Sequence, residues 1–178
     1  MYPFIRMFWQ LSKFRGAPRL ALTECHVSRH ICLPSDIDLW MELNNGRTLT
    51  LYDLGRIPLA VRTGLAGTLR DNRWGLTVAG ASVRYRRRIR MFETVEMRSR
   101  AIGWDARFFY LEQSLWKNSG ECANHVLYRT AVTGKDGIVP PAQVATALGV
   151  DVQSPKLPGW VANWIEADAL RPWPPMQD

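Results

Sequence analysis

Several common signatures are missing from this sequence, and each absence excludes a class of protein or site. The three cysteines, Cys25, Cys32 and Cys122, are odd in number and form no C-x-x-C pair, so neither a disulfide framework nor a zinc site is expected. No Gly-rich phosphate loop and no G-x-S-x-G motif occurs, so the enzyme classes built on them lack support. We therefore expect a cytoplasmic protein with reduced thiols, no metal and no cofactor of its own.

Long apolar runs are missing as well. No stretch approaches the ~20 apolar residues that cross a bilayer as a helix. The apolar N-terminal stretch MYPFIRMFWQLSKFR is interrupted by Arg6 and Lys13, and no small-residue cleavage site follows it. We therefore expect no signal peptide.

What is present is an ordinary globular composition with an excess of basic residues. Hydrophobic residues make up 47% of the 178 residues, which suits one domain with a proper core and argues against disorder. The formal net charge of +7 favours an acidic partner. Nucleic acid, a membrane surface and a phosphorylated cofactor such as coenzyme A all qualify, and composition alone does not choose among them.

The periodicity of apolar residues changes along the chain. Leu51, Leu54, Ile57 and Val61 recur at helical spacing, whereas the flanking runs alternate with period two. The strand-like runs are Thr23–Leu33, Leu76–Arg90, Thr94–Trp104, Arg107–Lys117 and Glu121–Thr133. The order is strand, long helix and four consecutive strands, which predicts an α+β fold with an antiparallel meander curled round one helix.

The two ends of the chain are predicted to be helical. At the N-terminus, Phe4, Phe8 and Leu11 recur at helical spacing, and we expect a helix over residues 3–16 that packs on the domain and hides its aromatic side chains. A membrane-surface helix is the less favoured alternative, because such helices are usually more basic. At the C-terminus, Ala142–Leu148 and Gly159–Ala169 are expected to be helices.

These predictions define a single domain. Its core is expected from about residue 22 to 135, with the N-terminal helix before it and a helical extension over residues 140–178. The extension contains Trp160, Trp164 and Trp173 among prolines, and we expect them to cover an exposed sheet edge or a partner subunit.

The histidines do not form a metal site. His26 and His30 face the same way on the first strand, but their Cα atoms would lie roughly 13 Å apart at ~3.3 Å per residue. We expect both to be surface or partly buried side chains. His125 stands alone.

The most informative stretch runs from residue 36 to 56, DIDLWMELNNGRTLTLYDLGR. It resembles the D-x-D-x-x-G-H-V-N-N-x-x-Y…E-x-x-R run of hotdog-fold acyl-CoA thioesterases of the 4-hydroxybenzoyl-CoA thioesterase type. The matching residues are Asp36, Asp38, Asn44, Asn45, Asp53 and Arg56. Met41 stands where Gly is usual and Glu42 where His is usual. The resemblance implies a hotdog fold and hydrolysis of an acyl-CoA thioester.

The resemblance assigns the catalytic carboxylate to Asp38, which matches the second aspartate of D-x-D. The alternative is a turn or helix-capping aspartate, since Asp is among the preferred residues there. The backbone N–H groups from Glu42 to Asn45, at the start of the helix, are expected to hold the oxyanion. Asn44 and Asn45 are expected to orient water or the acyl carbonyl, and one of them to cap the helix.

The side chain of Glu42 has two possible effects on this chemistry. A carboxylate beside the thioester carbonyl opposes the negative charge that develops there, unless it points away. Alternatively, Glu42 is itself the base.

Asp53 and Arg56 lie three residues apart, on one face of the predicted helix. The resemblance suggests that the acidic position faces the active-site region. A structural salt bridge is the favoured alternative.

A run of arginines follows the long helix. In a strand, Arg84, Arg86, Arg88 and Arg90 would point to one face, and this row suits the phosphates of coenzyme A through forked hydrogen bonds. We expect at least one of Arg86, Arg87 and Arg88 to contact them, unless nearby glutamates neutralise the row. Nucleic acid is not expected, because aromatic residues do not alternate with these arginines on the same face.

Two functions remain open from the sequence. The first is an acyl-CoA thioesterase, with coenzyme A entering only as part of the substrate. The second is a catalytically degenerate hotdog protein that binds acyl thioesters or acts as an interaction module. In either case an unpaired sheet edge, together with the resemblance, predicts a homodimer or tetramer with sites between subunits.

Overall fold

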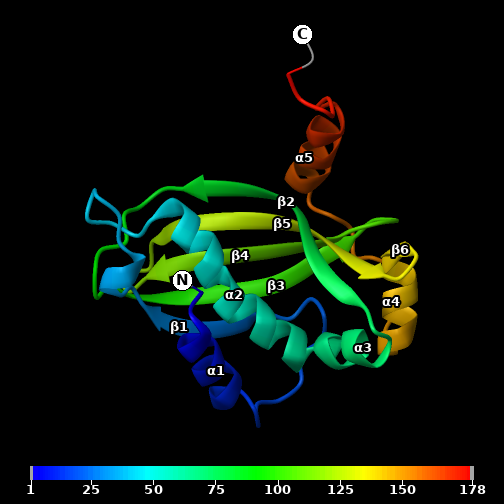
Figure 1. The fold of residues 1–178 in the computed structure, drawn as a ribbon, viewed down its shortest axis with the longest axis horizontal. Helices are drawn as coiled ribbons and strands as arrows, with labels where there is room; N and C mark the ends of the chain where they lie inside the picture. The colour runs from blue at the N-terminus through cyan, green and yellow to red at the C-terminus, as the bar shows by residue number, and fades with distance from the viewer. Residues whose placement is uncertain (1, 177–178) are drawn as a thin grey trace.

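A single sheet lies against one long helix at the centre of the molecule (Figure 1). The computed structural model describes residues 2–176. In chain order the elements are α1 (Phe4–Lys13), β1 (His26–Ile31), the 3-10 helix η1 (Pro34–Asp36), α2 (Asn45–Arg62), α3 (Leu65–Asp71), β2 (Gly75–Tyr85), β3 (Thr94–Trp104), β4 (Phe109–Lys117), β5 (Cys122–Gly134), β6 (Gly137–Val139), α4 (Pro141–Leu148) and α5 (Gly159–Ala169).

The strands are ordered β1-β3-β4-β5-β2, with β6 added to β5, and every pairing is antiparallel. β3, β4 and β5 form the predicted meander because short connections join them. β2 is followed by a longer connection over residues 86–93 and pairs with β5 instead of β3, so the expectation that four consecutive strands are neighbours was wrong. A curled antiparallel sheet with α2 on one face is the hotdog arrangement, and the predicted α+β fold is confirmed.

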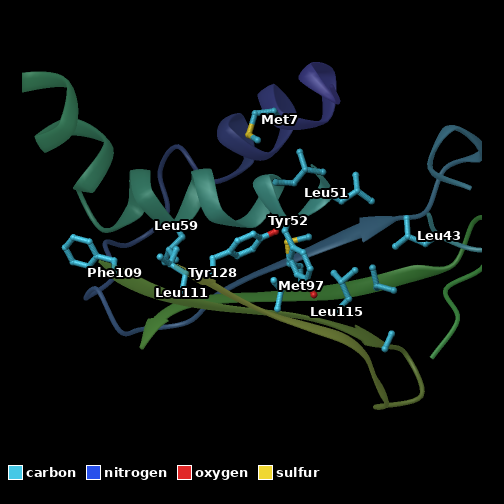
Figure 2. Close-up of a cluster of buried hydrophobic side chains, with 14 of the residues drawn as sticks. Met7, Leu43, Leu51, Tyr52, Leu59, Met97, Phe109, Leu111, Leu115 and Tyr128 are labelled. Atoms are coloured by element: carbon cyan, nitrogen blue, oxygen red, sulfur yellow. The ribbon is translucent and has the colours of Figure 1, made fainter. Parts of the chain in front are cut away.

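The core lies between α2 and the sheet. Tyr52 and Leu59 of α2 are buried, and Figure 2 shows both over the sheet, with Met97 among the side chains beneath them. The helix approaches β3 most closely at Gly55, where an added Cβ would stand 2.5 Å from the Ser99 hydroxyl and 2.6 Å from the Met97 sulfur. Glycine therefore sets the depth at which α2 sits, and with it the position of the helix start.

β2 is shorter than predicted. The expected strand Leu76–Arg90 ends at Tyr85, because the N–H groups of Arg86 and Arg87 both donate to the carbonyl of Ala123 and break the regular ladder. The chain then turns to the segment before α2, where Arg90 forms an isolated bridge with Glu42. The arginines after Tyr85 are therefore not on a strand, and the two-residue alternation predicted for them does not apply.

On β1 the face with the histidines is buried, and the face with Val27 and Ile31 is exposed. His26 and His30 are buried with exposed fractions of 0% and 6%, whereas Val27 and Ile31 are 43% and 42% exposed. The polar face is the covered one, since the His26 ring packs edge-on against Phe14 after α1. The prediction of surface or partly buried histidines was wrong.

Burial changes the titration of both histidines. It lowers the pKa of His26 to about 4, with help from the positive charge of Arg62, which donates to Nδ1 at 3.1 Å. It lowers the pKa of His30 to about 3, with smaller effects from nearby cations including Arg6. Both rings are therefore neutral in the folded protein at neutral pH.

α1 packs on α2, on the side away from the sheet (Figure 2). The packed face is formed by Met7 and Gln10, which are 6% and 5% exposed, and not by the aromatic residues. Phe4 and Phe8 point outward with exposed fractions of 61% and 68%. The helix exists as predicted, but the expectation that it hides its aromatics was wrong.

The C-terminal extension covers part of the other face of the sheet. Val161 of α5 is fully buried against Ile102, Tyr110 and Leu127, in a cluster separate from the core beneath α2. Arg129 anchors the same helix through an ion pair with Asp168 at 2.8 Å. The helix therefore lies on a sheet face. That the tail tryptophans cover a partner subunit stays a prediction.

Candidate active site

Asp36 organises the segment that leads into α2. It is completely buried and accepts hydrogen bonds from Arg6 at 2.6 Å, Arg47 at 2.7 Å and the N–H of Leu33 at 3.0 Å. Burial alone would raise the pKa of Asp36, but these hydrogen bonds outweigh it and hold the pKa below its usual value. The first aspartate of D-x-D therefore ties α1, η1 and the first turn of α2 together.

Asn44 caps α2. Its side-chain oxygen accepts from the N–H of Arg47 at 2.9 Å, and its carbonyl accepts from the N–H of Thr48 at 2.8 Å. The N–H groups of Asn45 and Gly46 have no acceptor within the helix, as is usual for the first turn. These two donors stand at the positive end of the helix dipole, where a developing oxyanion is stabilised.

A cavity of about 210 Å³ opens beside this helix start. It brings together five of the residues predicted from sequence, which are Glu42, Asn45, Arg86, Arg87 and Arg88. Leu43, Thr48, Tyr85, Ile89 and Asn124 complete its lining.

Sequence reasoning missed Thr48, Tyr85 and Asn124. Thr48 occupies the tyrosine position of the resembled motif, a departure that the sequence comparison overlooked. The Tyr85 hydroxyl donates to the Asn45 carbonyl at 3.0 Å. The two residues are 40 positions apart in the sequence, so no local sequence pattern predicts this contact. Asn124 lies mid-strand, where nothing in the sequence marks it.

Glu42 lies in the cavity with its charge compensated. Its Oε2 is 2.9 Å from Nε of Arg88, and its side chain is 27% exposed. Within residues 2–176 that oxygen has no aligned hydrogen-bond donor, so its contact with Arg88 is an ion pair and not a hydrogen bond. The repulsion expected between Glu42 and a developing oxyanion is therefore partly offset by Arg88.

Asp38 does not line the cavity. Its Oδ1 accepts from the N–H of Trp40 at 2.9 Å, and its own N–H donates to the Glu42 carbonyl at 2.9 Å. These contacts close a small turn over residues 38–42 that aims Glu42 inward. The turn alternative considered for Asp38 matches this geometry.

The cavity has a polar floor. Asn124 is 3% exposed, and its Oδ1 accepts from the hydroxyl of Tyr52, which is fully buried beneath α2. Burial raises the pKa of Tyr52 well above its usual value, so the phenol stays protonated as the donor. With Oδ1 engaged by Tyr52, the Nδ2 group is the remaining hydrogen-bonding group on the Asn124 side chain, which lines the cavity.

A basic groove of about 760 Å³ adjoins the cavity through Arg86, Arg87 and Arg88, which line both. Arg87 is paired with Glu121 at 2.8 Å and Arg88 with Glu42. Within residues 2–176, no carboxylate lies at ion-pair distance from Arg86 or Arg90, and both are exposed. Of the four arginines that line the groove, Arg87 and Arg88 are thus neutralised, and the guanidinium groups of Arg86 and Arg90 remain available to an anion.

Asp53 and Arg56 lie apart from this cavity. They form an ion pair with each other on α2, and the Arg56 guanidinium stacks 4.4 Å from the centre of the Tyr128 ring. Tyr2, near the N-terminus, lies beside this ion pair. Burial together with the Asp53 charge raises the pKa of Tyr2 to about 12. This arrangement is the salt bridge that the sequence favoured over a substrate-binding role.

No metal site accompanies these groups. Among residues 2–176, no three His, Cys, Asp or Glu side chains gather closely enough to hold a metal ion.

Comparison with known proteins identifies related sequences and related folds. A family model described as the thioesterase-like superfamily matches residues 32–165. The Xenopus laevis protein THEM6 is 33% identical over 165 residues, covering 92% of this chain and 78% of the frog protein.

Solved structures share the fold at low sequence identity. The probable thioesterase YbaW from Escherichia coli superposes with a TM-score of 0.65 at 14% identity, covering 72% of this chain and 99% of YbaW. The Staphylococcus aureus protein SAV2348, solved in complex with CoA, gives a TM-score of 0.60 at 10% identity, covering 74% and 85%.

Proposed function

Because this chain belongs to the thioesterase-like superfamily, we propose that it hydrolyses the thioester of an acyl-CoA at the cavity beside the start of α2. One observation carries the proposal. A carboxylate, Glu42, shares a cavity with the first turn of a helix, and that cavity opens directly into a basic groove.

The chemistry requires a base for water and a stabiliser for the oxyanion. In the proposed reaction Glu42 takes a proton from a water molecule, whose oxygen bonds to the thioester carbon. The N–H groups of Asn45 and Gly46 hold the resulting oxyanion. The carbon–sulfur bond then breaks, and Glu42 returns the proton to the departing CoA thiolate.

Asp38 remains the alternative carboxylate. We favour Glu42 because it lines the cavity, whereas Oδ1 of Asp38 is engaged by the N–H of Trp40. The two assignments are distinguishable by substitution, since Asn at position 38 preserves most turn hydrogen bonds and Gln at position 42 preserves size.

The basic groove is proposed to bind the phosphates of coenzyme A. Arg86 and Arg90 are the favoured contacts because their guanidinium groups have no carboxylate partner within residues 2–176. Forked guanidinium hydrogen bonds suit phosphate oxygens. The related fold of SAV2348, which was solved with CoA, supports a ligand of this class.

The acyl group is proposed to be small. A cavity of about 210 Å³ corresponds to about seven water volumes at ~30 Å³ each, and the bond between Tyr52 and Asn124 closes its floor. A long alkyl chain would have to displace that buried pair to continue beneath α2. The Nδ2 group of Asn124 favours an acyl group that carries a hydrogen-bond acceptor.

A homodimer or tetramer is part of the proposal. β2 is an edge strand of eleven residues, paired on one side by β5, and its Leu76 and Val78 are 37% and 44% exposed. Long unpaired edges are normally covered by another chain or blunted. Light scattering at micromolar concentration should give at least a dimer mass, and a monomer mass would contradict this part.

A binding module without catalysis is the second candidate. It is favoured by the ion pair that engages Glu42 and the turn that engages Asp38, which together occupy the two candidate catalytic carboxylates. The test is to supply purified protein with acyl-CoAs of graded size and polarity and to follow release of free thiol. Turnover supports the hydrolase, whereas saturable binding without thiol release supports the binding module.

A further inference from the structure

The outward face of α1 is apolar and has no cover within the described chain. Phe4, Ile5, Phe8 and Trp9 are 61%, 85%, 68% and 68% exposed. They stand at positions i, i+1, i+4 and i+5 and therefore share one side of the helix. Contiguous exposed patches of this kind mark an interaction surface more often than isolated exposed residues do.

The helix that carries the patch is attached to the domain through its other residues. Met7 and Gln10 are buried on the opposite side of the helix, and Arg6 reaches Asp36 at 2.6 Å and the Ile31 carbonyl at 2.9 Å. In Figure 2, α1 lies beyond α2 as the layer farthest from the sheet. The aromatic face therefore points away from the body of the protein, where a flat surface can meet it.

The charge around the patch has one sign. Residues 1–23 contain Arg6, Lys13, Arg15 and Arg19 and no Asp or Glu. Arg6 is neutralised by Asp36, and the other three are exposed at and after the end of the helix. The surroundings of the aromatic face are thus basic, in line with the net charge of +7.

We propose that α1 docks the protein on an anionic lipid bilayer, with Phe4, Ile5, Phe8 and Trp9 entering the interface and Lys13, Arg15 and Arg19 meeting lipid phosphates. Aromatic side chains on one helix face and basic residues beside them are the pattern of interfacial helices. A second copy of this chain fits less well, because facing α1 helices would bring like charges together. No helix within residues 2–176 is long and apolar enough to cross a membrane.

Co-sedimentation of the purified full chain with vesicles tests this proposal. Vesicles of phosphatidylcholine alone are compared with vesicles that also contain phosphatidylglycerol. We expect binding to the anionic vesicles, weaker binding to the neutral ones, and loss of the difference at high salt. Phe8→Ser with Trp9→Ser should weaken the partition coefficient by at least about tenfold, because two large apolar side chains no longer enter the interface.

Two matched variants separate docking from general effects. Leu170→Ser with Trp173→Ser removes two large apolar side chains that are 84% and 88% exposed elsewhere, and should leave vesicle binding unchanged. Lys13→Gln with Arg15→Gln should weaken binding to anionic vesicles only. Circular dichroism and the unfolding midpoint should match those of the wild type in each case.

Three results would overturn the proposal. The first is a wild type that sediments no more with anionic vesicles than without vesicles. The second is an equal loss of binding in the Leu170/Trp173 control. The third is a wild type that does not bind vesicles and whose mass is halved by the Phe8→Ser and Trp9→Ser substitutions. A second copy of the chain would then cover the face. None of these readouts requires thioester hydrolysis.

Discussion

Nε of Arg88 lies 2.9 Å from Oε2 of Glu42 at the mouth of the candidate active site. Glu42 stands at the histidine position of the resembled motif. Arg88 belongs to the arginine run and lies 46 positions further along the chain. The chain meets itself here because the segment after β2 leaves the sheet and bridges to the segment before α2 through Glu42 and Arg90. The replacement of His by Glu is therefore accompanied by a positive partner.

The basic groove leads to a prediction about substrate affinity. Arg86→Ala with Arg90→Ala should raise KM for acyl-CoA by about tenfold or more, since each guanidinium–phosphate contact contributes on the order of 1 kcal/mol or more. KM for a short thioester that lacks the nucleotide should change little. Arg87→Ala is the control, because Glu121 already neutralises Arg87. Equal losses on both substrates would mean that the groove is structural.

The floor of the cavity leads to a prediction about acyl preference. Asn124→Ala removes the amide that Tyr52 donates to and enlarges the cavity. We expect the preference to shift towards longer acyl groups. The kcat/KM for a longer acyl group, divided by the kcat/KM for a small polar one, should rise by about tenfold, the scale of one lost polar contact. Stability should fall by about 1–3 kcal/mol, because the buried Tyr52 hydroxyl loses its closest acceptor. An unchanged acyl preference would place the acyl group elsewhere.

Asp36 is predicted to be the most sensitive polar residue of the site. Asp36→Asn leaves Arg6 and Arg47 facing a neutral side chain in a buried position. We expect the free energy of unfolding to fall by on the order of 3 kcal/mol, measured by urea denaturation. Asp71→Asn is the control, because Asp71 is 64% exposed and its pair with Arg70 lies on the surface. A loss below about 1 kcal/mol at position 36 would contradict the role assigned to it.

The buried histidines predict a pH dependence of stability. The pKa values of His26 and His30 are lowered from 6.5 to about 4 and about 3 in the folded protein. The unfolded chain therefore binds more protons below pH 6.5, and stability should fall as the pH drops from there towards 4. Each histidine contributes at most about 1.4 kcal/mol per pH unit. His30→Gln should make this slope shallower, and an unchanged slope would show that His30 does not cause it.

The fold was predictable because periodicity is a local property. The change from period two to helical spacing and back marks β1, α2 and the later strands, and the motif from Asp36 to Arg56 indicates the hotdog arrangement. Which face of an element is covered is not local. α1 precedes β1, and the burial of His26 and the exposure of Phe8 both depend on how α1 lies on α2 and β1. The sequence pattern therefore predicted these elements but assigned the wrong faces.

The candidate site was predictable to a similar extent. The motif and the arginine run predicted Glu42, Asn45 and Arg86–Arg88, which the fold brings into one cavity. Tyr85 and Asn124 come from β2 and β5, whose pairing depends on the order of strands in the sheet. That order was mispredicted, so their meeting with the helix start was not foreseen.

The rate of thioester hydrolysis by Glu42→Gln tests the central claim most directly. Thiol release from a small acyl-CoA is followed for the wild type, Glu42→Gln and Asp38→Asn, with circular dichroism to confirm folding. The account predicts that the wild type turns over and that Glu42→Gln lowers kcat by about 10²-fold or more, the scale of losing a positioned base. Asp38→Asn should retain kcat within about tenfold, since Asn forms similar turn hydrogen bonds. A wild type that turns over while Glu42→Gln keeps its full kcat would contradict the account.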